Sequence, residues 1–88
     1  MKRAIKMHKE DNVCVLLIDA HPGDSILVDG TEIVSVSDIN MPHKAAIVDI
    51  PKGFAVIKFG EKIGYATEDI KKGELVHNHN FDAEIIMR

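Results

Sequence analysis

The amino-acid sequence predicts one compact all-β domain that occupies residues 1–88. Three observations lead to this fold class. No stretch repeats apolar residues at helical spacing over the roughly ten residues that a stable helix needs. The apolar residues lie instead in short runs dominated by valine, isoleucine and leucine, which pack well on a pleated sheet. Finally, a chain of 88 residues has the length of a single domain with one hydrophobic core.

Short strands are expected along most of the chain. Residues 13–18 form a continuous apolar run, which predicts a strand buried on both faces. Residues 31–37 alternate β-branched and small polar side chains, as in a half-buried strand. The segment 60–62 fits a hairpin connection, and the tail from Asp82 fits either a last strand or a single helical turn. Further strands are expected at residues 45–48, 55–59, 63–67 and 75–79.

A degenerate internal repeat organises these strands. Its frame is an aspartate, usually an isoleucine, two variable residues, a glycine or proline, two more residues and an apolar one. Each copy is expected to form a turn that leads into a strand. The apolar residue after the aspartate anchors the chain in the core, and glycine adopts turn dihedrals that other residues resist. The uneven spacing argues against a solenoid, which keeps a fixed period. The four copies are residues 19–26, 38–45, 49–56 and 69–76.

Composition and charge argue against several classes of function. Eleven basic and fourteen acidic residues give a net charge of -3, so no basic stripe for nucleic acid and no binding to a membrane surface are expected. The apolar run at residues 13–18 is far too short to span a bilayer. Cys14 is the sole cysteine, which excludes an internal disulfide and favours a reducing cytoplasm. Its apolar surroundings predict a small, buried and unreactive side chain.

Histidines are the residues that most suggest chemistry, because the chain has five of them. His77 and His79 are two residues apart on an expected strand, so both side chains should point to the same side. That geometry suits joint coordination of a divalent metal ion, or two imidazoles that line one pocket. The simpler interpretation is an exposed pair. Asn80 follows directly and is expected to supply amide hydrogen bonds to a substrate.

A second candidate site is the pair His43-Lys44, where the second repeat copy turns into its strand. A histidine beside a lysine combines a general acid/base with a fixed positive charge, which is useful against a carboxylate. The simpler interpretation is a polar loop tip. The sequence has no Ser-His-Asp order, no phosphate-binding glycine loop and no Cys-x-x-Cys metal clip.

Taken together, several stretches resemble one known family. They are KMHKEDNV at residues 6–13, PHKAA at 42–46, IKFGEKIGYA at 57–66 and GELVHNHN at 73–80. The combination resembles the SAF domain of the altronate and galactarate dehydratases, which is a separate small subunit in some relatives, including sulfolactate sulfo-lyase. In those relatives glycine precedes the His-Lys pair, and Pro42 stands at that place here. The ending at residues 77–80 is more similar to the altronate and sulfolactate branches.

The resemblance implies a β-clip fold, the compact all-β arrangement of SAF and antifreeze-like domains. It also implies the small subunit of a hydroxy-acid lyase that acts with a separate large catalytic subunit and requires iron or manganese. Such a lyase takes a proton from the carbon next to a carboxylate and expels water or sulfite. A sugar acid such as altronate is the expected small hydroxy-acid substrate, and sulfolactate is the alternative.

The chemistry of that elimination suggests a role for each candidate residue. Lys44 is expected to bind the substrate carboxylate, with Asn80 adding hydrogen bonds. His43 is expected to transfer a proton, which makes His43 and Lys44 the catalytic pair. His77 and His79 are expected to bind the metal ion or to complete the pocket wall.

Two other functional interpretations stay open at this point. A stand-alone binding module of the same fold would recognise a small acid or a protein partner without catalysis, and no large partner would be encoded beside it. A metal-handling domain built on the histidine pair would bind metal as an isolated chain. Unpaired apolar strand edges also predict self-association, so a homo-oligomer is a further expectation.

Overall fold

The computed structural model describes residues 1–83 and consists of strands, turns and bends within that range. The all-β prediction is therefore confirmed, and no helix long and apolar enough to cross a membrane occurs in the part of the chain described. Residues 84–88, which include most of the tail expected after Asp82, lie outside the described residues. The strands are β1 (Lys2–Ile5), β2 (Val13–Leu16), β3 (Ser25–Val28), β4 (Thr31–Val34), β5 (Lys44–Ala46), β6 (Ala55–Lys58), β7 (Glu61–Ala66), β8 (Leu75–Val76) and β9 (Phe81–Asp82).

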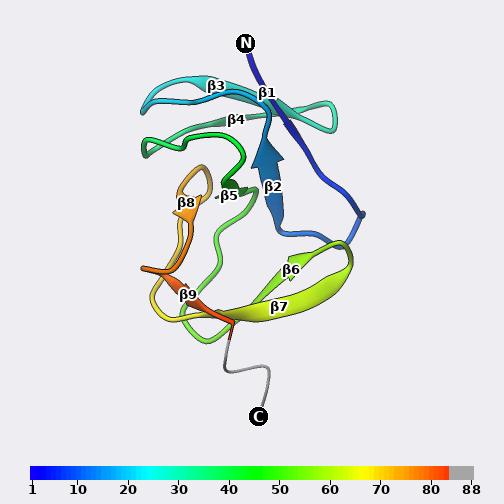
Figure 1. Cartoon of the computed structure of the whole chain (residues 1–88), viewed down its shortest axis with the longest axis vertical. Coiled ribbons are helices and arrows are strands. Elements are labelled where there is room, and N and C mark those ends of the chain that lie inside the picture. Colours follow the sequence, from blue (N-terminus) through cyan, green and yellow to red (C-terminus); the bar gives the residue numbers. More distant parts are fainter. Residues whose placement is uncertain (84–88) are drawn as a thin grey trace.

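The strands form two sheets: the first extends from the N-terminal end of the domain to its middle, and the second lies at the other end (Figure 1). The first sheet has the order β4-β3-β1-β2-β5-β8, and the second has the order β6-β7-β9. Strand β1 runs parallel to β3, whereas the other pairs are antiparallel. In Figure 1 the strands β1, β3 and β4 lie at the end that carries the N-terminus, and the second sheet lies at the other end. Strands β2, β5 and β8 lie between them.

Two hydrophobic cores share the central strands β2 and β5. Val13 and Ala46 are opposite each other and face one core, together with Ile50, Val56, Ala66, Ile70 and Val76. Cys14 and Ala45 are the next opposite pair and face the other core. Successive residues of a strand point to opposite faces, which explains why both faces of β2 are buried, as the continuous apolar run predicted. Burial also raises the pKa of the Cys14 thiol to about 11, which agrees with an unreactive side chain.

Some predicted strand boundaries are wrong because the chain leaves the sheet early. The expected strand at residues 13–18 ends at Leu16, and Leu17 and Ile18 are 47% and 46% exposed. The expected strand at residues 75–79 ends at Val76, where a turn begins. The expected strand at 31–37 ends as strand β4 at Val34.

The internal repeat is a real structural unit, and its copies associate in pairs. The second residue of every copy is buried, namely Ala20, Ile39, Ile50 and Ile70. Ala20 pairs with Ile39 through backbone hydrogen bonds, and Ile50 pairs with Ile70 in the same way. In all four copies the N–H of the sixth residue donates to the carbonyl of the third, at 2.8–3.0 Å. The copies are thus four versions of one turn, joined two by two.

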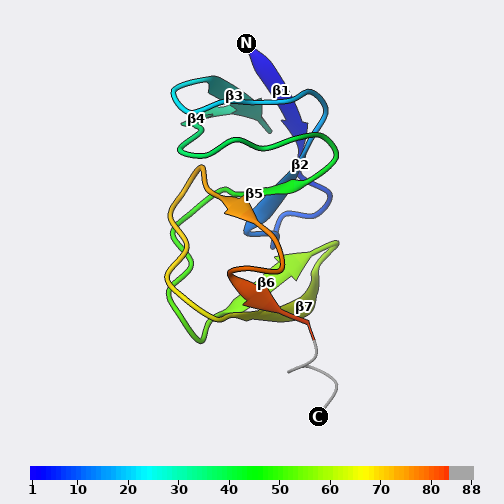
Figure 2. The same cartoon turned by 60° about the vertical axis from the view of Figure 1, so that its left-hand side comes forward.

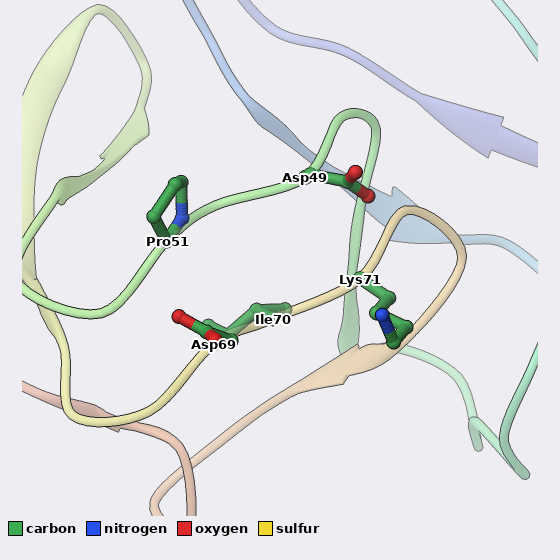
Figure 3. A pocket seen from close by; sticks show the side chains of 5 residues that line it. All are labelled: Asp49, Pro51, Asp69, Ile70 and Lys71. Carbon is green, nitrogen blue, oxygen red and sulfur yellow. The ribbon is translucent and has the colours of Figure 1, made fainter.

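The aspartate that opens each copy binds the turn of the partner copy. Asp49 accepts a hydrogen bond from Lys72 N–H and Asp69 accepts one from Lys52 N–H, both at 2.9 Å. Figure 3 shows the two segments of this pair side by side, around a hollow of about 210 Å³ lined by Asp49, Pro51, Asp69, Ile70 and Lys71. These reciprocal bonds lock the third and fourth copies together.

The first and second copies keep this bond on one side and replace it on the other. Asp19 accepts the expected bond from Met41 N–H at 2.9 Å. The position that should donate to Asp38 is Pro22, which has no N–H. Asp38 instead lies 2.8 Å from Nδ1 of His21, and this contact raises the pKa of that histidine. The imidazole therefore takes the place of the missing backbone donor.

Asp11 and Asn12, which precede β2, attach the β6–β7 hairpin to the first sheet. The carboxylate of Asp11 is 6% exposed and accepts hydrogen bonds from Gly60 N–H at 2.8 Å and from Phe59 N–H at 3.1 Å. The Asn12 side chain accepts from Ile57 N–H at 2.8 Å and donates to the carbonyl of Ala55 at 2.9 Å. We call these two residues the hairpin clamp.

The hairpin clamp predicts a specific loss of stability in acid. Burial acts to raise the pKa of Asp11, but the backbone hydrogen bonds from Gly60, Phe59 and His8 outweigh burial and hold it below the usual 3.8. A lowered pKa stabilises the folded state above about pH 4, and this contribution disappears as the pH falls through the folded-state pKa. Asp11→Asn should lower the free energy of unfolding at pH 7 by about 1–3 kcal/mol, because an amide N–H₂ then faces backbone donors.

Urea unfolding at pH 7 and at pH 3 measures this effect. The difference between Asp11→Asn and the wild type should shrink at pH 3, where the wild type loses the same contribution. Glu61→Gln removes an exposed carboxylate from the same hairpin and serves as the control. Equal stability of both variants at pH 7 would contradict the role of the clamp.

Candidate functional site

Strand pairing brings His43, Lys44 and His77 together. Lys44 opens β5, and β5 pairs with β8 so that Lys44 lies opposite Val76. His43 precedes Lys44 and His77 follows Val76, so the two histidines are neighbours across the antiparallel pair. Their rings meet edge to face with centroids 4.8 Å apart. In Figure 2 the orange segment that carries β8 lies beside β5 in the middle of the domain. Two of the predicted motifs, distant in sequence, thus form one site.

A hollow of about 140 Å³ opens at this point of the surface. It is lined by Pro42, His43, Lys44, Lys58 and His77. Lys58 ends β6 and reaches the hollow from the hairpin held by the clamp. Lys58 lies in the family-like stretch at residues 57–66, but the candidate site residues did not include it, because only the fold brings it to the hollow. Its placement depends on long-range hydrogen bonds between residues 11–12 and the hairpin.

The turn before β5 fixes the proton of His43. Nδ1 of His43 lies 2.8 Å from the carbonyl oxygen of Asn40. A carbonyl accepts only, so Nδ1 carries the hydrogen and Nε2 of the neutral ring keeps a lone pair. Pro42 takes the place of the repeat glycine, and its peptide bond with Met41 is cis. The turn nevertheless closes as in the other copies, with His43 N–H donating to Asn40 at 2.8 Å.

Lys44 is a half-buried cation with an aromatic neighbour. Its Nζ lies 5.0 Å from the centroid of the Phe81 ring, within the range of a cation–π interaction. Burial lowers the pKa of Lys44, and the positive charge of Lys58 lowers it further. An anion bound in the hollow would offset both effects, because it would neutralise the repulsion between the two ammonium groups.

His77 is biased toward its neutral form. Burial lowers its pKa, and the charges of His43, Lys44 and His79 lower it further. A neutral imidazole accepts a proton or a hydrogen bond and adds no charge of its own. The hollow therefore combines two lysine cations with two imidazoles, one of which has a defined tautomer. Such a set can bind a carboxylate and move a proton.

The structure corrects the expected geometry of His79 and Asn80. The chain turns after Val76, so His77 and His79 do not lie on one strand and the same-side argument fails. His79 is exposed in the turn. Asn80 is fully buried: its Oδ1 accepts from His77 N–H at 2.9 Å and its Nδ2 donates to the carbonyl of Leu75 at 2.7 Å. The expected contact of Asn80 with a substrate would break these bonds, so we assign it a positioning role.

The residues described do not by themselves fit a complete metal site. No group of three or more histidine, cysteine, aspartate or glutamate side chains suited to a metal ion occurs within residues 1–83. His77 and His79 offer two nitrogen ligands at most, and the positive charge of Lys44 acts on His77. Iron or manganese at these histidines stays a prediction that requires ligands from outside this set.

The buried amide of Asn80 gives a direct test of the turn. Asn80→Ala leaves His77 N–H and the Leu75 carbonyl without their partner and should lower the free energy of unfolding by about 1–3 kcal/mol. Asn78→Ala is the matched control, because Asn78 is exposed in the same turn. Urea unfolding compares the variants, and the amide proton of His77 should lose its protection from exchange in Asn80→Ala but keep it in Asn78→Ala. Equal stability of the two variants would refute the positioning role.

Comparison with known proteins places this chain in a family. The altronate/galactarate dehydratase SAF domain matches residues 2–84. Altronate dehydratase of Escherichia coli (strain K12) is 46% identical over 76 residues, which cover 86% of this chain and 15% of that protein. Altronate dehydratase of Bacillus subtilis (strain 168) is 40% identical over 80 residues, covering 91% of this chain and 16% of that protein.

A third relative is galactarate dehydratase (L-threo-forming) of Escherichia coli (strain K12), 36% identical over 73 residues, which cover 82% of this chain and 14% of that protein. The chain thus spans a small part of the length of each relative. The helix-free architecture of residues 1–83 agrees with the match, and the expected β-clip fold is confirmed. The chain belongs to the SAF domain family of the altronate and galactarate dehydratases.

Proposed function

We propose that this domain supplies the carboxylate-binding and proton-transferring half of a sugar-acid dehydratase site. The observation that carries the proposal is the convergence of His43, Lys44, Lys58 and His77 on one hollow. Relatives named altronate dehydratase and galactarate dehydratase make a hydroxylated sugar acid the fitting class of substrate. Sulfolactate, the alternative suggested by the resemblance, carries a carboxylate as well and would use the same lysines.

The residues of the hollow match the demands of the elimination. A proton must leave the carbon next to the carboxylate, and the departing hydroxide must gain one. Lys44 holds the carboxylate and stabilises the negative charge that grows on it. Nε2 of His43 carries the lone pair and exchanges the proton, while Nδ1–H stays bound to Asn40. His77, whose pKa is lowered by burial and by the neighbouring positive charges, forms the wall beside it.

The size of the hollow favours a half-site over a complete one. Pockets that enclose a small ligand usually measure about 300–1,000 Å³. The hollow measures about 140 Å³, which suits the carboxylate end of a sugar acid and leaves the rest of the molecule outside. We therefore propose that a larger catalytic chain covers the substrate, with this domain acting as its small subunit. A stand-alone binding module is the second candidate, and it would have to hold its ligand with this hollow alone.

Purification of the tagged chain from its native host tests the proposal. A larger partner should co-purify, and the complex should dehydrate a sugar acid when iron or manganese is supplied. Activity that disappears on separation and returns on mixing would support the subunit role. A chain that purifies alone and inactive would contradict it and favour the binding module.

Substitution of the histidine tests the proposed chemistry in that complex. His43→Gln should lower kcat by about 100-fold or more, because general acid–base catalysis typically contributes that much. The circular dichroism spectrum and the amount of bound partner should stay unchanged. His8→Gln, which removes an exposed imidazole elsewhere, is the control and should keep full activity. Full activity of His43→Gln would refute the proton-transfer role.

A further inference from the structure

The hollow contains two lysines from different sheets, and only one of them belongs to the His-Lys motif. Lys44 comes from the six-stranded sheet, and Lys58 comes from the three-stranded sheet. Both line the same hollow. The positive charge of Lys58 is close enough to lower the pKa of Lys44. Two like charges held together in the absence of a ligand destabilise each other, so this arrangement favours an anion between them.

Each lysine is held beside an aromatic ring. Nζ of Lys44 lies 5.0 Å from the centroid of Phe81, and Nζ of Lys58 lies 5.2 Å from the centroid of Phe59. A ring face attracts a cation and restricts a long flexible side chain. Phe81 is half-buried, so its contact partly orders the Lys44 ammonium before a ligand arrives, whereas Phe59 is 57% exposed and restricts Lys58 less.

The backbone on both sides of Lys58 is fixed by the hairpin clamp. Ile57 N–H donates to Asn12, and Phe59 N–H donates to Asp11. Phe59 and Gly60 both have positive φ, at 58° and 75°, so the chain bends sharply after Lys58. The clamp sets the position of the last β6 residue relative to β5, which carries Lys44.

We propose that Lys58 is a second substrate-positioning residue, which holds the carboxylate of a sugar acid together with Lys44. The inference rests on the proposed function and adds a named residue and a bridged mode of binding to it. One carboxylate oxygen faces each ammonium group, so the carboxylate is fixed in rotation as well as in place. His43 then meets the neighbouring carbon in a defined orientation.

Titration of the isotope-labelled chain with gluconate tests this binding mode without any partner. Gluconate is a six-carbon sugar acid, and sorbitol is its uncharged counterpart. Gluconate should shift the amide resonances of Lys44 and Lys58, and sorbitol should not. Lys58→Gln should weaken gluconate binding by about tenfold, the effect expected for one charged hydrogen bond. Lys58→Arg should restore most of the affinity, because it keeps the charge.

Lys62→Gln is the matched control, since Lys62 is exposed on β7 of the same hairpin and carries the same charge. It should bind gluconate like the wild type. Equal affinity of Lys58→Gln and Lys62→Gln would overturn the inference, and so would the absence of any gluconate shift in the wild type. Urea unfolding of Lys58→Gln should match the wild type, because a structural role alone would lower stability.

The complex with the larger chain separates this inference from the proposed function. There Lys58→Gln should raise KM with little change in kcat, whereas His43→Gln should lower kcat. An inactive His43→Gln with an unchanged Lys58→Gln would leave the proposed function intact and reject the role of Lys58. A fully active His43→Gln with a raised KM in Lys58→Gln would reject the proton-transfer role of His43 and support the role of Lys58.

Discussion

Strand β5 is hydrogen-bonded on both sides, to β2 and to β8, and the site is arranged around it. Its pairing with β8 puts His43 next to His77, although the two lie far apart in sequence. Its pairing with β2 anchors Ala45 and Ala46 in the two cores. The small side chains of these two alanines allow β2, β5 and β8 to pack closely between the two cores. The backbone of Lys44 is thus paired on both sides, with Val15 of β2 and with Val76 of β8.

The rest of the fold depends on one turn used four times. A backbone N–H group of one copy donates to the aspartate of its partner copy, in both directions between the third and fourth copies and in one direction between the first and second. The first copy is the exception, because Pro22 has no N–H to donate. The imidazole of His21 supplies the hydrogen bond to Asp38 instead. The second copy uses the same turn to orient His43, so a structural repeat has become part of a site.

The sequence predicted what local patterns encode. Burial of the first part of the apolar run at residues 13–18 and of the second residue of each repeat copy follows from hydrophobicity and turn chemistry, whereas the end of the strand at Leu16 does not. The pattern of residues 75–79 was misleading, because alternation continues through a turn that the buried Asn80 closes. Lys58 was missed for a different reason. Ile57, the residue before Lys58, donates a hydrogen bond to Asn12, which is 45 residues away in sequence. No local pattern predicts such a bond.

The two cores have a consequence for how the domain melts. Two separate cores would ordinarily allow one end of a protein to open while the other persists. Here β2 and β5 each place neighbouring residues in both cores, so loosening one core removes the support of the other. We therefore expect unfolding to be a single cooperative transition. The stiffness of the candidate site is then a property of this domain's own packing.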